Sequence, residues 1–395
     1  MDNTIIVSRK ILDEVKLDKN TKRIEELAGY GNCLCIAYNN KKMQYIRTGS
    51  DGGAGNEQQD IFKIDNEGNL LNDIQWDFDY ISKIILIPIP DVRIRIQNGN
   101  FITNISNDEY EQTNNNYMER NILVTRSNCE IKNINHTLSD NNKVFGPYHG
   151  FLEIKMLCDV DVRDCKLTAH KYVEQSSYDL ILEYSSNVKF ENVISDDINN
   201  INRWGITGTN YTKDITYSNC ILNRIDVHCG VYNLNINNCQ IGIKGIEVVG
   251  AGTLNIESTT INAQNALVYL RGDYGSTWNG TINVKDCQLK NITQPNLFYF
   301  MLSYNNNGEI HDYGYPLCLP NVNVDGLTID DDKIDKSVKS IYLFFNTKDR
   351  TKIENGDISN IYQLPKNIVL KDVETKSGRD IKIFYNDING FNINN

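Results

Sequence analysis

The sequence predicts an all-β protein: a right-handed single-stranded parallel β-helix of about a dozen coils with a short N-terminal cap. Three observations favour this fold. A phrase of alternating apolar residues ending in Asn, Asp or Ser recurs along the chain, strand patterns without helices fill the intervals, and cysteine often follows the phrase. A strand repeat with a period in the twenties is typical of stacked coils, and parallel crossovers are right-handed.

The phrase is clearest in ITYSNC (215–220) and LNINNC (234–239). Its Asn, Asp or Ser falls at 133, 164, 192, 219, 238, 258 and 286, in steps of 31, 28, 27, 19, 20 and 28 residues. Alternating apolar residues predict a strand with one face inward. Because Asn tolerates the left-handed conformation, this position predicts a sharp corner that stacks from coil to coil.

The cysteines fit the same repeat. Four of the ten cysteines, Cys165, Cys220, Cys239 and Cys287, follow the phrase directly. We expect them to point inward as small apolar side chains with free thiols. The N-terminus lacks a conventional secretion signal, which also disfavours disulfides.

We divide the chain into an N-terminal cap or strand-loop region (1–80), a parallel β-helix (81–330) and C-terminal coils or a cap (331–395). A short helix is expected between Leu12 and Leu27, and strand-like runs begin at 81–87 and 92–96. The pattern does not specify the fold of 1–80 and 331–366. The alternative fold is an antiparallel β-sandwich, which predicts hairpin turns and no fixed Asn or Cys position.

Composition excludes several classes of function. The net charge of −11 argues against nucleic acid as a partner. The chain has no run of about 20 apolar residues, so the sequence predicts no membrane-spanning helix. Without a signal peptide, a protein made in the bacterial cytoplasm would reach the outside by another route, such as a virus particle.

Polar residues concentrate on one outward strip of the expected coils. Side chains on adjacent coils lie about 5 Å apart, a distance at which carboxylates can flank a glycosidic bond or hold a cation. The competing interpretation is an ordinary solvated face. The candidate catalytic residues are Asp226, His228, Glu247, Asp273 and His311. The candidate substrate-binding residues are Arg203, Trp204, Arg224, Arg271, Tyr274, Trp278, Asp312 and Tyr313.

Four phrases carry a resemblance: RWGITGTNY (203–211), RIDVHCGV (224–231), LRGDYGSTWNG (270–280) and HDYGYP (311–316). They resemble right-handed parallel β-helix proteins of the pectate-lyase-like superfamily, in particular tail-spike or appendage proteins of phages that infect Gram-positive bacteria. The resemblance spans residues 120–330. It implies a virion protein, usually a homotrimer in contact with other virion proteins, that binds and often cuts a bacterial capsule, exopolysaccharide or teichoic acid.

The first functional hypothesis is therefore a depolymerase, with Asp226 and Asp273, and Glu247 beside them, as acid, base or nucleophile. In this hypothesis His228 and His311 carry protons, and Arg224 and Arg271 hold a phosphate or uronate. No cofactor or metal ligand is assigned, but a lyase variant would use Ca²⁺ held by carboxylates. A receptor-binding adhesin without catalysis and a purely structural spike are the alternatives. The polymer, its cleavage and the number of chains stay open.

Overall fold

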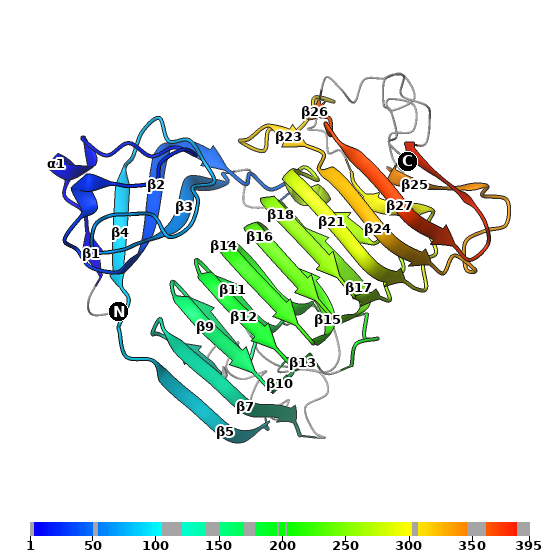
Figure 1. Ribbon diagram of the computed structural model, residues 1–395, viewed down its shortest axis with the longest axis horizontal. Helices are drawn as coiled ribbons and strands as arrows, with labels where there is room; N and C mark the ends of the chain where they lie inside the picture. The colour runs from blue at the N-terminus through cyan, green and yellow to red at the C-terminus, as the bar shows by residue number, and fades with distance from the viewer. Residues whose placement is uncertain are drawn as a thin grey trace.

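The computed structural model describes residues 4–49, 54–104, 121–139, 150–169, 178–195, 197–201, 204–301, 307–345 and 361–384. They form an N-terminal antiparallel sheet and a long parallel β-helix beside it (Figure 1). The parallel β-helix predicted from the repeat is confirmed. No helix in the described part of the chain has the length and apolar character that a membrane crossing requires.

The N-terminal sheet has the strand order β1-β4-β2-β3. Its strands are β1 (Ile5–Ile6), β2 (Cys33–Gln44), β3 (Asn56–Ile64) and β4 (Lys83–Pro88), and all neighbours are antiparallel. The run at 81–87, expected among the coils, thus contributes to this sheet. The parallel strands begin after Pro90, with β5 (Ile94–Thr103).

The helix expected between Leu12 and Leu27 is largely absent. The structure has only α1 (Arg9–Leu12) and the 3-10 helix η1 (Glu25–Leu27) there. The reason is the burial pattern: Val15 and Leu17 are both buried while the residue between them is exposed. Alternate burial requires extended backbone, because residues two apart point to opposite sides of a helix.

Ten strands stack in register as one face of the β-helix. They are β5, β7 (Cys129–Leu138), β9 (Cys158–Arg163), β12 (Ser186–Glu191), β14 (Gly205–Ser218), β16 (Cys229–Asn237), β18 (Gly250–Glu257), β21 (Trp278–Leu289), β24 (Asn321–Ile329) and β27 (Ile368–Thr375). Each pairs in parallel with the next. The described residues therefore give ten levels, close to the dozen expected.

A second face carries the polar strip. It comprises β6 (Ile122–Val124), β8 (Leu152–Lys155), β11 (Tyr178–Glu183), the start of β14, β15 (Ile221–Asp226), β17 (Gln240–Val248), β20 (Val268–Leu270), β22 (Asn296–Tyr299), β25 (Ser340–Phe345) and β28 (Asp380–Phe384). Short strands complete the coils: β10 (Lys166–Leu167), β13 (Ile194–Ser195) and β19 (Thr260–Ile261). Outside this sheet, β23 (Leu317–Cys318) pairs with β26 (Tyr362–Gln363).

The corner position behaves as predicted. The residues at all seven positions have φ between 50° and 55°. Their side chains also join adjacent coils: Asn192 donates to Asp164 at 2.8 Å, and Asn238 donates to Asn219 at 2.6 Å. Residues far apart in the sequence are thus vertical neighbours, which is the geometric basis for assembling a site from several coils.

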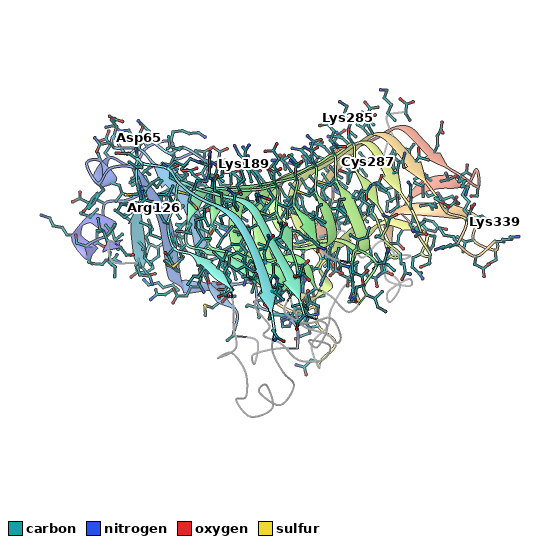
Figure 2. All side chains as sticks on the ribbon, turned by 90° about the horizontal axis from the view of Figure 1, so that it is seen from below. Asp65, Arg126, Lys189, Lys285, Cys287 and Lys339 are labelled. Atoms are coloured by element: carbon teal, nitrogen blue, oxygen red, sulfur yellow. The ribbon has the colours of Figure 1, made fainter. Side chains whose placement is uncertain are left out.

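The four repeat cysteines are buried free thiols, as predicted, and the six other cysteines are also free and buried. Cys287 lies inside the coil, whereas Lys285, two residues earlier, projects from the outer surface (Figure 2). Apolar side chains from all three faces fill the interior. The four repeat cysteines are therefore part of the core of the coils.

The N-terminal sheet packs along the side of the coils (Figure 1). A shared apolar cluster joins the two units, and includes Ile36, Ile61, Tyr211 and Val249. Two ion pairs reinforce the contact: Lys213 with Asp60 at 2.6 Å and Lys63 with Asp159 at 2.7 Å. The first coil, by contrast, leaves Ile94, Ile96, Phe101 and Ile102 of β5 exposed.

Candidate functional site

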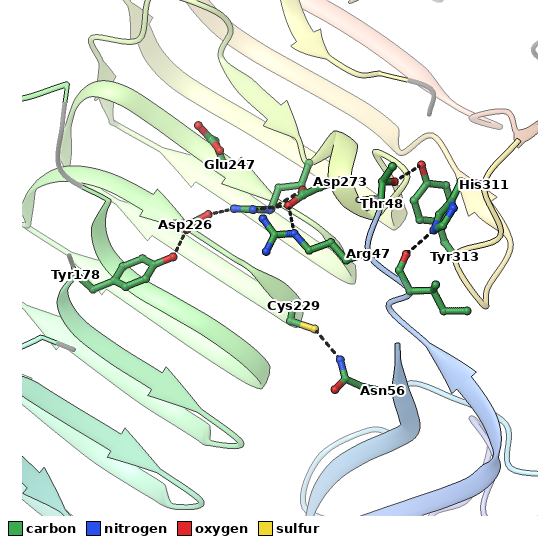
Figure 3. Close-up of polar contacts among 12 residues, drawn as sticks. Arg47, Thr48, Asn56, Tyr178, Asp226, Cys229, Glu247, Asp273, His311 and Tyr313 are labelled. Carbon is green, nitrogen blue, oxygen red and sulfur yellow. Dashed lines mark hydrogen bonds and ion pairs between the residues drawn. The ribbon is translucent and has the colours of Figure 1, made fainter. Parts of the chain in front are cut away.

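Three arginines and three acidic residues form one continuous chain of ion pairs on the polar strip. Figure 3 shows the part of it that runs from Asp226 through Asp273 to Arg47. Negative and positive side chains alternate along it. We refer to this set as the charged chain; in order, it consists of Glu247, Arg224, Asp226, Arg271, Asp273 and Arg47. Arg224 lies 3.1 Å from Asp226, and Arg271 lies 2.8 Å from Asp273.

The coil register explains how these residues meet. Asp226 ends β15 and pairs in register with Glu247 of β17, one level away. Arg271 directly follows β20, the next level, and Asp273 lies in the short 3-10 turn Gly272–Tyr274. Arg47 comes from the segment after β2 and reaches Asp273 from the N-terminal unit at 3.0 Å.

Asp226 is the buried centre of the charged chain. Its side chain is 2% exposed. Tyr178 donates to Oδ2 at 2.7 Å, while Arg224 and Arg271 both donate to Oδ1. Burial alone would raise the pKa of this carboxyl, but the two guanidinium groups and Tyr178 together lower it. Asp226 therefore stays ionised and holds the two arginines in place.

The acidic residues at the outer part of the chain reach solvent. The Glu247 and Asp273 side chains are 21% and 24% exposed. Both oxygens of Asp273 accept hydrogen bonds from arginines. Glu247 uses Oε2 on Arg224, and its Oε1 has no hydrogen-bond partner among the described residues. Glu247 is thus the acidic residue of the chain best placed to exchange a proton with a ligand.

A cavity of about 250 Å³ lies beside the charged chain, where the N-terminal unit meets the coils. We call it the junction pocket; its side chains include Tyr45, Arg47, Asn56, Tyr184, Asn210, Tyr211, His228 and Tyr274. Aromatic rings with a few convergent polar groups are typical of a ligand site. The volume suits a single sugar-sized group.

His228 faces this pocket with an unused ring nitrogen. Its buried Nε2 has no hydrogen-bond partner in the described part of the chain. Burial, and next the positive charge of Arg271, lowers its pKa from 6.5 to about 4. The imidazole is therefore neutral near pH 7. Tyr274 packs against it edge-on, with ring centroids 5.7 Å apart.

The two candidate tryptophans differ in their surroundings. Trp204 is half-buried and packs edge-on against Tyr178, the residue that donates to Asp226, with ring centroids 5.3 Å apart. Trp278 is 0% exposed and donates from Nε1 to the carbonyl of Gly252 at 3.2 Å. Its ring belongs to the core and presents no face to a ligand. Arg203 lies outside the described residues.

The 311–313 segment contacts the N-terminal unit. His311 Nε2 lies 3.2 Å from the carbonyl oxygen of Ile46. Thr48 donates to the hydroxyl of Tyr313 at 3.3 Å, and Asp312 accepts from the amide of Gly314 at 2.8 Å. This segment therefore holds Ile46 and Thr48, the two neighbours of Arg47 in the sequence, in place.

Sequence reasoning missed several residues of the site. Arg47, Tyr45 and Asn56 lie in the non-repetitive N-terminal region, and no pattern links them to the coils. Tyr269 could have been found, because it occupies the repeat position that pairs with Glu247 on the next level. Its partner one level further is Tyr299.

The acidic residues of the site do not form a metal centre. No group of three or more His, Cys, Asp or Glu side chains among the described residues converges on a common point. The carboxylates of the charged chain are instead compensated by arginines.

No family model matches the chain. A capsule KL64-specific depolymerase of a Klebsiella phage is 28% identical over 120 residues, which cover 27% of this chain and 12% of that protein. The crystal structure of the Pseudomonas phage phi297 tailspike gp61 matches with a TM-score of 0.50 and 12% identity, covering 94% of this chain and 63% of that one. This likeness supports the β-helix fold alone.

Two further structures score 0.48: the gp49 tailspike of Pseudomonas phage LKA1, at 10% identity over 91% of this chain and 62% of that one, and the Gp54 tailspike of Acinetobacter baumannii bacteriophage AP22. The latter was solved with a capsular saccharide and is 9% identical over 94% of this chain and 63% of that one. The chain thus spans less than two thirds of the length of each of these four proteins.

Proposed function

We propose that this chain is a tailspike-type virion protein that binds a bacterial surface polysaccharide on the polar strip and cuts it there. The observation that carries the proposal is the charged chain, which places the partly exposed carboxylates of Glu247 and Asp273 beside buried arginines. Arg47, at its other end, lines the aromatic junction pocket. The partial match to a capsule depolymerase supports the same activity, and the β-helix fold of the phi297 tailspike is consistent with it.

In the proposed hydrolysis, protonated Glu247 donates its proton to the glycosidic oxygen as the bond from that oxygen to the sugar carbon breaks, because its Oε1 is uncommitted among the described residues. Asp273, whose side chain is 24% exposed, is the second carboxylate and takes a proton from the water that adds to that carbon. Asp226 is only 2% exposed and acts as a positioning residue: it orients Arg224 and Arg271 toward an anionic group of the substrate.

The substrate class is a capsule or exopolysaccharide. The arginines of the charged chain suit a uronate or another acidic sugar. The tailspikes and the depolymerase that the chain resembles come from phages of Klebsiella, Pseudomonas and Acinetobacter, which are Gram-negative. The expected Gram-positive host and teichoic acid gain no support from them. A homotrimer bound to other virion proteins is proposed from the sequence resemblance.

A lyase is the second candidate, favoured by one observation: His228 is neutral and its Nε2 is unpartnered among the described residues. A neutral imidazole near arginines can remove a proton next to a neutralised uronate. Lyase products absorb ultraviolet light through a new double bond, whereas hydrolysis products do not. A Ca²⁺ requirement would appear as loss of activity with a chelator.

The test is cleavage of a panel of purified capsular polysaccharides, exopolysaccharides and teichoic acids, followed by size-exclusion chromatography. We expect the wild-type protein to shorten one polysaccharide and Glu247→Gln to lower the rate about 10²- to 10⁴-fold. Glu257→Gln is the matched control, because this exposed glutamate pairs with Lys285 on another face. Binding without shortening would identify an adhesin, and unchanged cleavage by Glu247→Gln would reject this site.

A further inference from the structure

Beyond Glu247 the polar strip changes character and becomes aromatic. Glu247 pairs in register with Tyr269 on the next level, and Tyr269 pairs with Tyr299 on the level after that. The two rings stack with centroids 4.9 Å apart and planes 14° apart. Since coils are spaced about 4.8 Å apart, the two tyrosines continue the row that contains Glu247.

These rings border a hollow of about 370 Å³. The other side chains that line it are Asn265 and Gln294, both exposed. None of the described lining residues is charged. The hollow therefore combines apolar ring surface with two amide groups that can both donate and accept hydrogen bonds.

The two rings lie outside the core of the coil. Their inward-facing neighbours Val268 and Leu270 are fully buried, whereas Tyr269 and Tyr299 are half-buried and present part of their surface to solvent. Burial, and next the charge of Glu247, raises the pKa of Tyr269, so its phenol keeps the proton and can donate.

We propose that Tyr269, Tyr299, Asn265 and Gln294 form a binding subsite for a neutral sugar residue of the polysaccharide, next to the glycosidic bond whose oxygen Glu247 protonates. The apolar C–H face of a hexose or N-acetylhexosamine packs on aromatic rings, and amides bind its hydroxyl groups. An acidic sugar is disfavoured, because Glu247 is the neighbouring charge in this row. This inference rests on the proposed function and deepens it.

The test uses the Glu247→Gln protein on an array of neutral and acidic bacterial polysaccharides. We expect it to bind a polymer that contains neutral sugars, and the added pair Tyr269→Ala/Tyr299→Ala to weaken binding about 10- to 30-fold. The ring-preserving pair Tyr269→Phe/Tyr299→Phe should stay within about threefold. Tyr80→Ala is the matched control, a half-buried tyrosine on the N-terminal unit.

A second variant, Asn265→Ala/Gln294→Ala, tests the same hollow through exposed side chains if loss of the rings prevents folding. Tight binding that neither pair alters would overturn the subsite while leaving the proposed function intact. Binding and cleavage confined to polymers of acidic sugars would also overturn it. If wild-type protein neither binds nor cuts any polymer, the proposed function and this subsite both fail.

Discussion

The protonation of His228 gives a quantitative test of the junction pocket. Burial lowers its pKa from 6.5 to about 4 in the folded chain. Because the neutral form is favoured by folding, full stability is present above pH 6.5 and declines as the pH falls toward 4. Multiplying this shift by 1.36 kcal/mol per pKa unit gives a loss of about 3 kcal/mol.

The perturbation that isolates this contribution is His228→Gln, which fills similar space and does not titrate. Urea unfolding of both proteins, followed by circular dichroism from neutral pH to about pH 4, gives the difference in their free energies of unfolding. We expect that difference to move by about 3 kcal/mol in favour of the variant as the pH falls.

The pKa of His228 can be measured directly by NMR, from the ring-carbon signals of ¹³C-labelled histidine. The signal that disappears in His228→Gln should titrate near pH 4. A midpoint near 6.5, with no pH-dependent change in the stability difference, would show that water and counter-charge reach the ring freely. That result would refute the buried, neutral imidazole on which the lyase candidate depends.

Two further predictions concern stability. Lys213→Met should cost about 3–5 kcal/mol in thermal unfolding, because it leaves the buried Asp60 carboxylate without its cationic partner. Lys213→Met/Asp60→Asn should recover part of this loss, because the neutral amide needs no counter-charge and its oxygen can still accept a backbone N–H bond, as Asp60 does from Ile61, Gln75 and Trp76. An equal loss in both variants would contradict the ion-pair explanation. Asn238→Ala should cost about 1–2 kcal/mol in urea unfolding, since its φ of 51° suits Asn or Gly, whereas Asn238→Gly should cost less; equal losses would point to the side-chain ladder with Asn219 instead.

Much of the fold could be predicted from the sequence, because the repeated residues determine the backbone shape of each coil. An inward residue every second position and a left-handed corner at a fixed position determine a coil, and both signals are visible at Asn219 and Asn238. The N-terminal unit carries no such repeat. Its β4 strand reads like a coil strand locally, and only its antiparallel partners β1 and β2 distinguish it.

The site was predictable only in part, because the coil repeat places some of its residues and not the others. Register alone brings Asp226 and Glu247 together, and their sequence spacing reveals this. Side-chain burial is not a property of the pattern, so Trp278 looks like a sugar platform in the sequence although it is a core residue. Arg47 belongs to the N-terminal unit and is separated by 226 residues in the sequence from Asp273, its partner in the site. No local motif indicates such a contact.

The most direct test of the central claim is a crystal structure of Glu247→Gln soaked with an oligosaccharide released by the wild-type protein. We predict a sugar chain along the polar strip, with a glycosidic oxygen within hydrogen-bonding distance of the side chain at position 247 and the adjoining sugar against Tyr269 and Tyr299. A chain bound instead along the asparagine-rich groove of the first face, lined by Asn235, Asn255 and Asn283, would contradict it.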